Sequence, residues 1–181
     1  MATVSARDVI RELNLSPHPE GGYYREVFRS PHRVQSHSHD GPRSASTQIY
    51  YLLESGSFSA FHRVSSDETW HHYLGDAVEL CVLREAGVER LRLGSALALG
   101  ERPQHVIPAG EWQAARVTAS AHGFALCGCS VAPGFEFSDF EMPTRSDLLR
   151  LFPEQRFPEH QELILALTRP SGPPTTSEGT S

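Results

Sequence analysis

The sequence predicts a mainly β protein, built as an antiparallel sandwich or barrel. Many short segments rich in β-branched and aromatic residues alternate with Gly, Pro and Ser breakers, which is typical of strands. Helical periodicity occurs only near the two ends of the chain, so the helices that connect the strands of a parallel sheet are not expected. A chain of 181 residues, of which 39% are hydrophobic, suffices for one core and is short for two. We therefore expect a single domain over residues 1–168.

The chain begins with a short predicted helix over residues 6–14. Ser5 can cap this helix, because Asp8 stands three residues later as in a capping box, and the apolar residues that follow share one helical stripe. Two Pro, three His and several Ser without a periodic apolar face predict a loop over residues 30–44. The predicted strands lie on both sides of this loop, at residues 23–29, 47–53, 57–64, 68–73, 77–84, 88–93, 104–108, 111–117 and 122–132.

The pattern becomes helical again after Pro143. Ser146 can cap a first turn that carries three Leu residues, and Pro158 begins a segment whose apolar residues recur at helical spacing. These two segments predict a pair of C-terminal helices. Residues 169–181 are dominated by Pro, Ser, Thr and Gly, which bury too little apolar surface to offset the entropy of ordering. This tail is therefore predicted to be disordered.

Charge and composition argue against several classes of function. The 22 acidic side chains outnumber the 16 basic ones, and no stretch gathers basic residues, so a nucleic-acid partner is not expected. No apolar run is long enough to cross a bilayer, and the N-terminus lacks a secretory pattern. Three cysteines, an odd number in apolar surroundings, favour reduced thiols. The sequence thus predicts a cytoplasmic protein without membrane contact.

Two motifs with defined spacing lie in the strand-rich region. The first consists of Gly56, His62, Glu68 and Gly75, and the second is Pro-Ala-Gly-Glu-Trp-Gln at residues 108–113. This two-part pattern resembles the paired motifs of the cupin superfamily. The resemblance implies a small β-barrel with a ligand or metal site inside.

Longer segments strengthen this resemblance. Residues 18–26 (HPEGGYYRE), 67–71 (DETWH) and 128–141 (GCSVAPGFEFSDFE) look like a largely uncharacterised family of small single-domain cupin-like proteins. The likeness implies a double-stranded β-helix, that is a cupin jelly-roll barrel, with a pocket at one mouth and pairing into a homodimer. The chain departs from metal-binding cupins at Val64 and Gln113, which stand where those proteins carry their second and third histidines.

The expected pocket is read first as a ligand-binding site. Imidazole, carboxylate and amide groups orient hydroxyls or amide edges, aromatic rings stack on a sugar or a base, and arginines such as Arg25, Arg63 and Arg116 meet phosphate if they face inward. A nucleotide or nucleotide-sugar is therefore the preferred ligand class. The candidate ligand-binding residues are Glu20, Tyr24, Arg25, His62, Glu68, Trp70, His71, Gln113 and Phe135, with Trp112 and Phe137 as further stacking surfaces.

Two catalytic alternatives remain open. In the first, the protein is a metal-independent sugar or nucleotide-sugar epimerase or isomerase, as some cupins are. A neutral histidine suits proton abstraction beside a carbonyl, so His62 is the candidate base. The candidate acids are Tyr24, Tyr50, Tyr51 and Tyr73, among which the spacing does not decide. In the second, a divalent metal is held by His62, Glu68 and Gln113. No cofactor is expected, because Val64 supplies no ligand and the Gln113 amide is a poor one.

Two short motifs favour ordinary structural roles. His37-Ser38-His39 has the His-x-His form, but it lies in the predicted loop without a following Glu, so we expect solvated histidines. Cys127-Gly128-Cys129 lies in an apolar strand pattern, where free cysteine is a common small core residue. Neither motif predicts a metal site.

Overall fold

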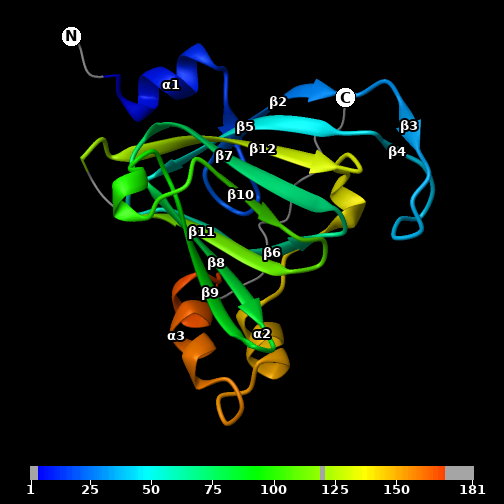
Figure 1. The fold of residues 1–181 in the computed structure, drawn as a ribbon, viewed down its shortest axis with the longest axis vertical. Helices are drawn as coiled ribbons and strands as arrows, with labels where there is room; N and C mark the ends of the chain where they lie inside the picture. Colours follow the sequence, from blue (N-terminus) through cyan, green and yellow to red (C-terminus); the bar gives the residue numbers. More distant parts are fainter. Residues whose placement is uncertain (1–3, 119–120, 170–181) are drawn as a thin grey trace, which may run out of the picture.

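Two antiparallel sheets face each other in the computed structural model, which describes residues 4–118 and 121–169 (Figure 1). The first sheet has the order β1 (Ser16–Pro17), β2 (Tyr23–Arg29), β5 (Thr47–Glu54), β12 (Phe124–Ala132), β7 (Asp67–Gly75) and β10 (Gln104–Ile107). The second has the order β13 (Phe140–Glu141), β6 (Phe58–Val64), β11 (Trp112–Val117), β8 (Val78–Arg84) and β9 (Gly87–Leu93). From β5 to β13 the chain passes back and forth between these two layers, except at the β8–β9 hairpin, and the predicted mainly β jelly-roll is confirmed.

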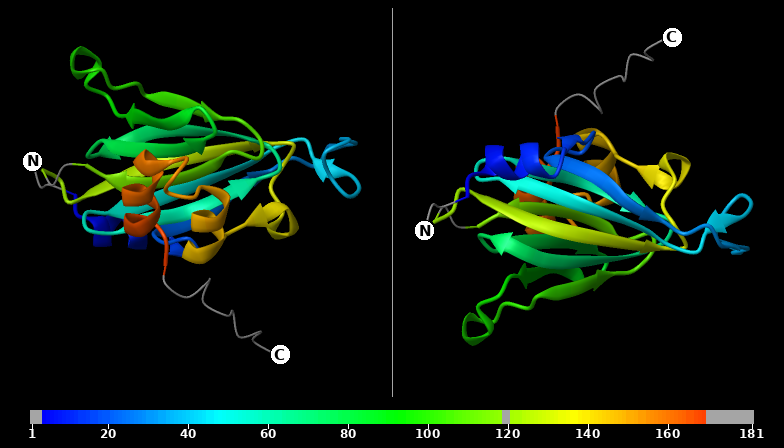
Figure 2. Two further views of the ribbon diagram at one scale, coloured as in Figure 1. Left: turned by 90° about the horizontal axis from the view of Figure 1, so that it is seen from below. Right: turned by 90° about the horizontal axis from the view of Figure 1, so that it is seen from above.

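Short helices cover the outer faces of both sheets. Helix α1 (Ala6–Glu12) lies on the six-stranded sheet, whereas α2 (Arg145–Leu151) and α3 (Pro158–Ala166) lie against the five-stranded sheet (Figures 1 and 2). The predicted capping box of Ser5 and Asp8 is present. Helix α2 begins two residues earlier than expected, because Thr144 is its cap and not Ser146. Single 3₁₀ turns occupy η1 (Leu97–Leu99) and η2 (Phe137–Asp139).

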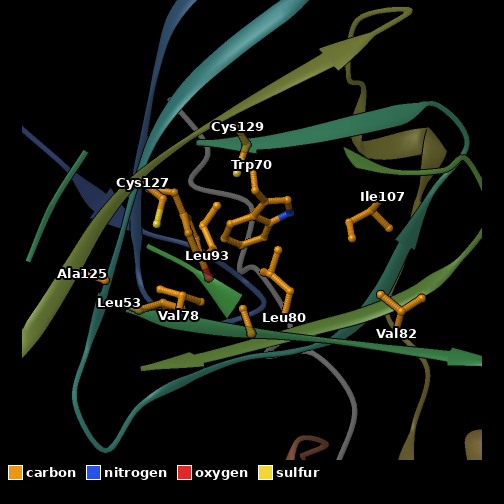
Figure 3. Close-up of a cluster of buried hydrophobic side chains, with 12 residues drawn as sticks. Leu53, Trp70, Val78, Leu80, Val82, Leu93, Ile107, Ala125, Cys127 and Cys129 are labelled. Atoms are coloured by element: carbon orange, nitrogen blue, oxygen red, sulfur yellow. The ribbon is translucent and has the colours of Figure 1, made fainter. Parts of the chain in front are cut away.

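Three apolar clusters hold these layers together. The largest fills the space between the sheets and includes Trp70, which is 1% exposed (Figure 3). A second joins the outer face of the five-stranded sheet to the C-terminal helices, with Leu148 at 0% exposure. A third lies under α1 on the six-stranded sheet. None of the helices in the described residues is both long and apolar enough to span a membrane.

The predicted loop over residues 30–44 departs from expectation in part. It carries a small hairpin of β3 (Arg33–Val34) and β4 (Arg43–Ser44) that extends past the end of the sheets (Figure 2). Arg43 anchors the hairpin, since its Nε and Nη2 donate to Asp139 at 2.6 and 2.7 Å. His39, expected to be solvated, is buried with Nε2 2.9 Å from the Ser66 hydroxyl. His37 is exposed as predicted.

The cysteines are core residues, as the strand pattern predicts. Cys81, Cys127 and Cys129 are free and buried. Burial raises the pKa of Cys81 and of Cys127 to about 12, so both thiols stay protonated at neutral pH. Of the predicted disordered tail, only Arg169 belongs to the described residues.

Candidate functional site

A cavity of about 140 Å³ opens at one end of the space between the sheets. Its floor and walls come from the ends of β2, β5, β6, β7 and β12, and residues 135–140 close it on the side of β6. An apolar cavity of similar size holds a benzene-sized molecule. The lining residues are His18, Glu20, Tyr24, Glu26, Arg29, Thr47, Ile49, Tyr51, His62, Val64, Glu68, Cys129, Val131, Phe135, Glu136, Phe137 and Phe140.

Two glycines bring the segment before β2 into this cavity. Gly21 and Gly22 have φ angles of 121° and 67°, which other residues rarely adopt. A Cβ atom on Gly21 would collide with the Phe58 carbonyl, and one on Gly22 would approach the Leu52 carbonyl to 2.5 Å. The glycines thus let this segment lie directly against β5 and β6. The result is that Glu20, which precedes them, is buried between the sheets at 5% exposure.

Glu20 lies between two imidazoles. Its Oε2 is 3.3 Å from His62 Nδ1 and 3.5 Å from His18 Nδ1, while Oε1 accepts a 2.9 Å hydrogen bond from Ser59. His62 Nδ1 is also 2.8 Å from the Ala60 carbonyl oxygen, which can only accept. Nδ1 of His62 must therefore carry a proton, and Nε2 is the nitrogen left for a ligand.

The environments of the two buried carboxylates shift their pKa values in opposite directions. Burial acts to raise the pKa of Glu20, but the charge of His62, the charge of His18 and the Ser59 hydrogen bond together hold that pKa below its usual value. Burial also lowers the pKa of His18, although the charge of Glu20 acts in the opposite sense. For Glu68, burial dominates and raises the pKa, although His62 acts in the opposite sense. One carboxylate is thus held ionised and the other is biased toward its protonated form.

A chain of hydrogen bonds fixes Glu68 from behind. Gln113 Nε2 donates to Glu68 Oε2 at 2.6 Å, and Gln113 Oε1 accepts from Trp70 Nε1 at 3.0 Å. The indole N–H can only donate, so it determines which end of the Gln113 amide faces Glu68. Gln113 is 2% exposed and lies opposite His62 in the pairing of β11 with β6. His62, Glu68 and Gln113 therefore gather in one interior region, as the resemblance to cupins implies.

Aromatic rings form the wall that faces these polar groups. The Phe140 ring lies 5.4 Å from the His62 ring, and the Phe135 and Phe137 rings lie 5.1 Å apart at a T-shaped angle. Tyr24 packs edge-on against His18 at 4.5 Å. Phe137 is 54% exposed, so it stands at the rim while the others lie deeper. A ligand in the cavity would thus contact ring faces on one side and charged groups on the other.

Arg29 is the one arginine or lysine among the described residues that line the cavity. It donates to both carboxylate oxygens of Glu26 at 3.0 and 2.8 Å and to Glu136 Oε1 at 2.8 Å. The pairing of β2 with β5 shifts register between Glu26 and Phe28, as at a β-bulge. This shift explains why an odd-numbered residue, Arg29, shares the cavity with Tyr24 and Glu26 on the same strand.

Comparison with known proteins supplies the family. Residues 7–143 match the family described as "Cupin superfamily (DUF985)". The chain belongs to this cupin family. It is similar to a solved hypothetical protein from Leishmania major, with 34% identity, a TM-score of 0.84, and coverage of 91% of this chain and 99% of that one.

Two further relatives match most of the chain. The solved protein SO0799 from Shewanella oneidensis is 35% identical, with a TM-score of 0.81 and coverage of 93% of this chain and 99% of that one. The uncharacterized protein YML079W of Saccharomyces cerevisiae is 28% identical over 159 residues, which are 81% of this chain and 79% of the relative. None of the names of these relatives states an activity.

Several residues predicted for the site of this cupin lie elsewhere. Trp70 faces inward but lies deeper, within the core, and contacts the site through Gln113 and the Tyr51 ring (Figure 3). His71 has the opposite strand parity and bonds Ser130 outside the cavity, with Nε2 3.3 Å from Oγ. Arg25 is exposed and donates to the Leu13 carbonyl at 3.1 Å.

The remaining predicted arginines also face away. Arg63 stacks over the Trp112 ring at 4.4 Å, so both side chains belong to the outer side of the five-stranded sheet. Arg116 pairs with Glu79 at 2.7 Å. Of the predicted ligand-binding set, the cavity wall contains Glu20, Tyr24, His62, Glu68 and Phe135, and Gln113 lies directly behind Glu68.

The residues present do not fit the metal site of metal-binding cupins. Val64 lines the cavity where those proteins place a histidine, and the Gln113 amide oxygen already accepts the indole N–H. Across the described ranges, no group of three or more His, Cys, Asp or Glu side chains is arranged to hold a metal ion. The groups available for chemistry in this site are therefore its own acidic and basic side chains.

Sequence reasoning did not assign His18, Arg29 or Phe140 to the site. His18 belongs to the quoted HPEGGYYRE segment, and its place beside Glu20 was a signal that could have been used. Phe140 likewise belongs to a quoted segment, and β13 carries it to the edge of β6. Arg29 had no such signal, because its inward direction depends on the bulge in β2.

Proposed function

We propose that this cupin binds a small polar ligand in the cavity and moves a proton on it without a metal, as a sugar epimerase or isomerase does. The observation that carries the proposal is the position of His62, whose Nδ1 is bonded to the Ala60 carbonyl at 2.8 Å beside the Glu20 carboxylate at 3.3 Å. This arrangement holds the Nδ1 proton on the Ala60 carbonyl and leaves Nε2 for the ligand. Such a nitrogen is suited to abstract a proton from carbon next to a carbonyl.

Glu20 is a positioning residue in this scheme. Its carboxylate supports the Nδ1 proton and stabilises the imidazolium that forms when Nε2 takes a proton from the substrate. The lowered pKa of Glu20, which results from the two imidazoles and Ser59 in spite of burial, keeps the carboxylate ionised for this role. An acidic neighbour of this kind also fixes the orientation of the ring.

Glu68 supplies the second proton in the proposed reaction. Burial raises its pKa and favours a protonated carboxyl, which can donate to the carbanion or to the enolate oxygen. His62 removes one proton from the substrate, and Glu68 returns one proton to the other face of the same carbon or to another atom. The substrate neither gains nor loses electrons, so the reaction needs no oxidant or cofactor. Tyr24 also lines the cavity and is the alternative acid. Tyr51 is less suited, because its hydroxyl donates to the Gly21 carbonyl at 2.7 Å.

The size of the cavity limits the ligand. A volume of about 140 Å³ accommodates one ring near His62 and Glu68, so a longer ligand must extend past Phe137 at the rim. A nucleotide or nucleotide-sugar is the second candidate, favoured by the stacking surface of the aromatic wall. Its phosphate would have to compete for Arg29 with Glu26 and Glu136.

Solvent deuterium exchange tests the proposed reaction. The protein is incubated in D₂O with a panel of aldoses, ketoses and their nucleotide conjugates, and deuterium at carbon is followed by NMR. We expect exchange at the carbon beside the carbonyl of at least one compound, and a loss of about 10²-fold or more in the His62→Ala variant. The matched control is His71→Ala, which removes an imidazole outside the cavity and should keep the wild-type rate.

Variants of the two candidate acids separate their roles. Glu68→Gln should abolish exchange if Glu68 returns the proton, whereas Tyr24→Phe should then reduce it only a few-fold. The opposite result would assign the acid to Tyr24. The proposal fails if no compound exchanges, or if the compound that exchanges does so equally with His62→Ala.

A further inference from the structure

The cavity is acidic, although the arginine and aromatic residues of the sequence favoured a nucleotide or nucleotide-sugar ligand. Its lining contains four carboxyl groups, from Glu20, Glu26, Glu68 and Glu136, against the single guanidinium of Arg29. Arg29 is already paired with Glu26 and Glu136, so these two carboxylates neutralise its charge at the mouth of the cavity. Low-dielectric walls focus the field of like charges into a cleft. The lining therefore repels an anion and attracts a cation.

Among the described residues, neither of the deeper carboxyl groups is paired with an arginine or a lysine. Glu20 is supported by the Ser59 hydroxyl and the imidazoles of His62 and His18. Glu68 receives its hydrogen bond from a neutral amide, Gln113. A positive charge on a ligand would thus supply the partner that the protein does not, at a depth where Coulomb interactions are stronger than in water.

The opposite wall suits the same kind of ligand. Tyr24, Phe135, Phe137 and Phe140 present aromatic rings to the cavity, with neighbouring ring centroids 5.1 to 6.3 Å apart in the phenylalanine cluster. Cations are attracted to ring faces, and several rings around one site are the usual way that proteins recognise substituted ammonium groups. Aromatic faces and carboxylates in one enclosed space are thus complementary to an organic cation and not to phosphate.

We infer that the ligand of this cavity is a small organic cation, an amine-bearing sugar or another substituted ammonium compound of about one ring in size. This inference rests on the proposed ligand-binding function and gives it a substrate class. A protonated amine enters between the aromatic wall and the Glu20 and Glu68 carboxyls, while its neutral part reaches His62. Ligands that carry phosphate are disfavoured at the same position.

A binding experiment with matched probes tests the charge preference. Isothermal titration at constant ionic strength compares glucosamine, glucose and glucose 6-phosphate, which share one ring and differ in charge, with tetramethylammonium chloride as a cation without hydroxyls. We expect glucosamine to bind at least 10-fold more tightly than glucose, and glucose 6-phosphate to bind more weakly than glucose. Tetramethylammonium should compete with glucosamine.

Variants locate the effect in the cavity. Phe137→Ala removes a ring at the rim, where the side chain is 54% exposed and its loss is tolerable for folding, and it should weaken glucosamine by several-fold and glucose little. Glu20→Gln replaces the cavity carboxylate that is held ionised and should reduce the glucosamine-to-glucose ratio. Glu141→Gln is the control, because this carboxylate pairs with Arg63 on the outside and its loss should leave the ratio unchanged.

The outcomes are distinct from those of the exchange experiment. Equal binding of glucosamine and glucose, tighter binding of glucose 6-phosphate, or absence of measurable binding by both cations would overturn the cationic ligand class. Each of these results is obtained without turnover, so it leaves the role of His62 to the deuterium measurement. Conversely, cation preference without any exchange would retain the ligand class and reject the proposed catalysis.

Discussion

Replacing Gln113 by Leu tests the hydrogen-bonded chain behind the cavity. Gln113, Trp70 and Glu68 are 2%, 1% and 7% exposed, so water cannot replace the lost partner. The indole N–H left without an acceptor should cost about 1–3 kcal/mol, and the lost hydrogen bond to the carboxylate about 1.5–3 kcal/mol. We therefore expect the free energy of unfolding to fall by about 2.5–6 kcal/mol, a large part of the stability of an ordinary domain.

The assay is urea denaturation followed by tryptophan fluorescence, with the slope against urea checked for constancy. The loss should be larger at pH 8 than at pH 4, because the amide of Gln113 stabilises the ionised form of Glu68 and is of less use to the protonated form. Gln104→Leu is the matched control, since this side chain is exposed on β10 and its change should cost less than about 0.5 kcal/mol.

A double variant isolates the interaction itself. In Trp70→Phe combined with Gln113→Leu, the indole N–H and its acceptor are removed together, so the combined loss should fall short of the sum of the single losses by about 0.5–3 kcal/mol. A Gln113→Leu variant that loses less than about 1 kcal/mol, or single effects that simply add, would refute the reasoning from the two hydrogen bonds.

Glu68→Gln should raise the melting temperature at neutral pH. Burial raises the pKa of Glu68, so ionisation of this carboxyl destabilises the folded protein above pH 4.5. The melting temperatures of the two proteins should converge as the pH falls below that value. Leu148→Ala should cost about 2–5 kcal/mol in urea denaturation because this side chain is 0% exposed under the five-stranded sheet. Leu151→Ala, at 55% exposure on the same helix, should cost less than about 0.5 kcal/mol, and equal losses would contradict the packing of that helix.

The long strands were predictable because each carries its own alternating pattern. The predicted segment 77–84 became Val78–Arg84 and the segment 111–117 became Trp112–Val117. The two-residue strands β1, β3, β4 and β13 were not predicted, since two residues are too few to show any period. They form where longer strands or other two-residue segments offer free backbone groups.

Within the site, sequence spacing predicted which face of a strand a side chain occupies, but it did not predict whether that side chain reaches the cavity or stays in the core. Glu68 and Trp70 share the inner face of β7, as their even spacing implies, but only Glu68 reaches the cavity while Trp70 belongs to the core. Arg29 was missed for a different reason. A single bulge between Glu26 and Phe28 reverses the facing of the strand after that point, and local sequence does not report such a shift.

The indole of Trp70 limits which substitutions could create a metal site in this cavity. Such a site would need histidines in place of Val64 and Gln113, yet an imidazole at 113 would meet the same indole N–H that now bonds the amide at 3.0 Å. The proton of that N–H would compete with a metal ion for the nitrogen lone pair. Histidines at positions 64 and 113 would then not suffice for metal binding unless Trp70 also changed. The tryptophan beneath the pocket thus makes a metal site depend on a third substitution.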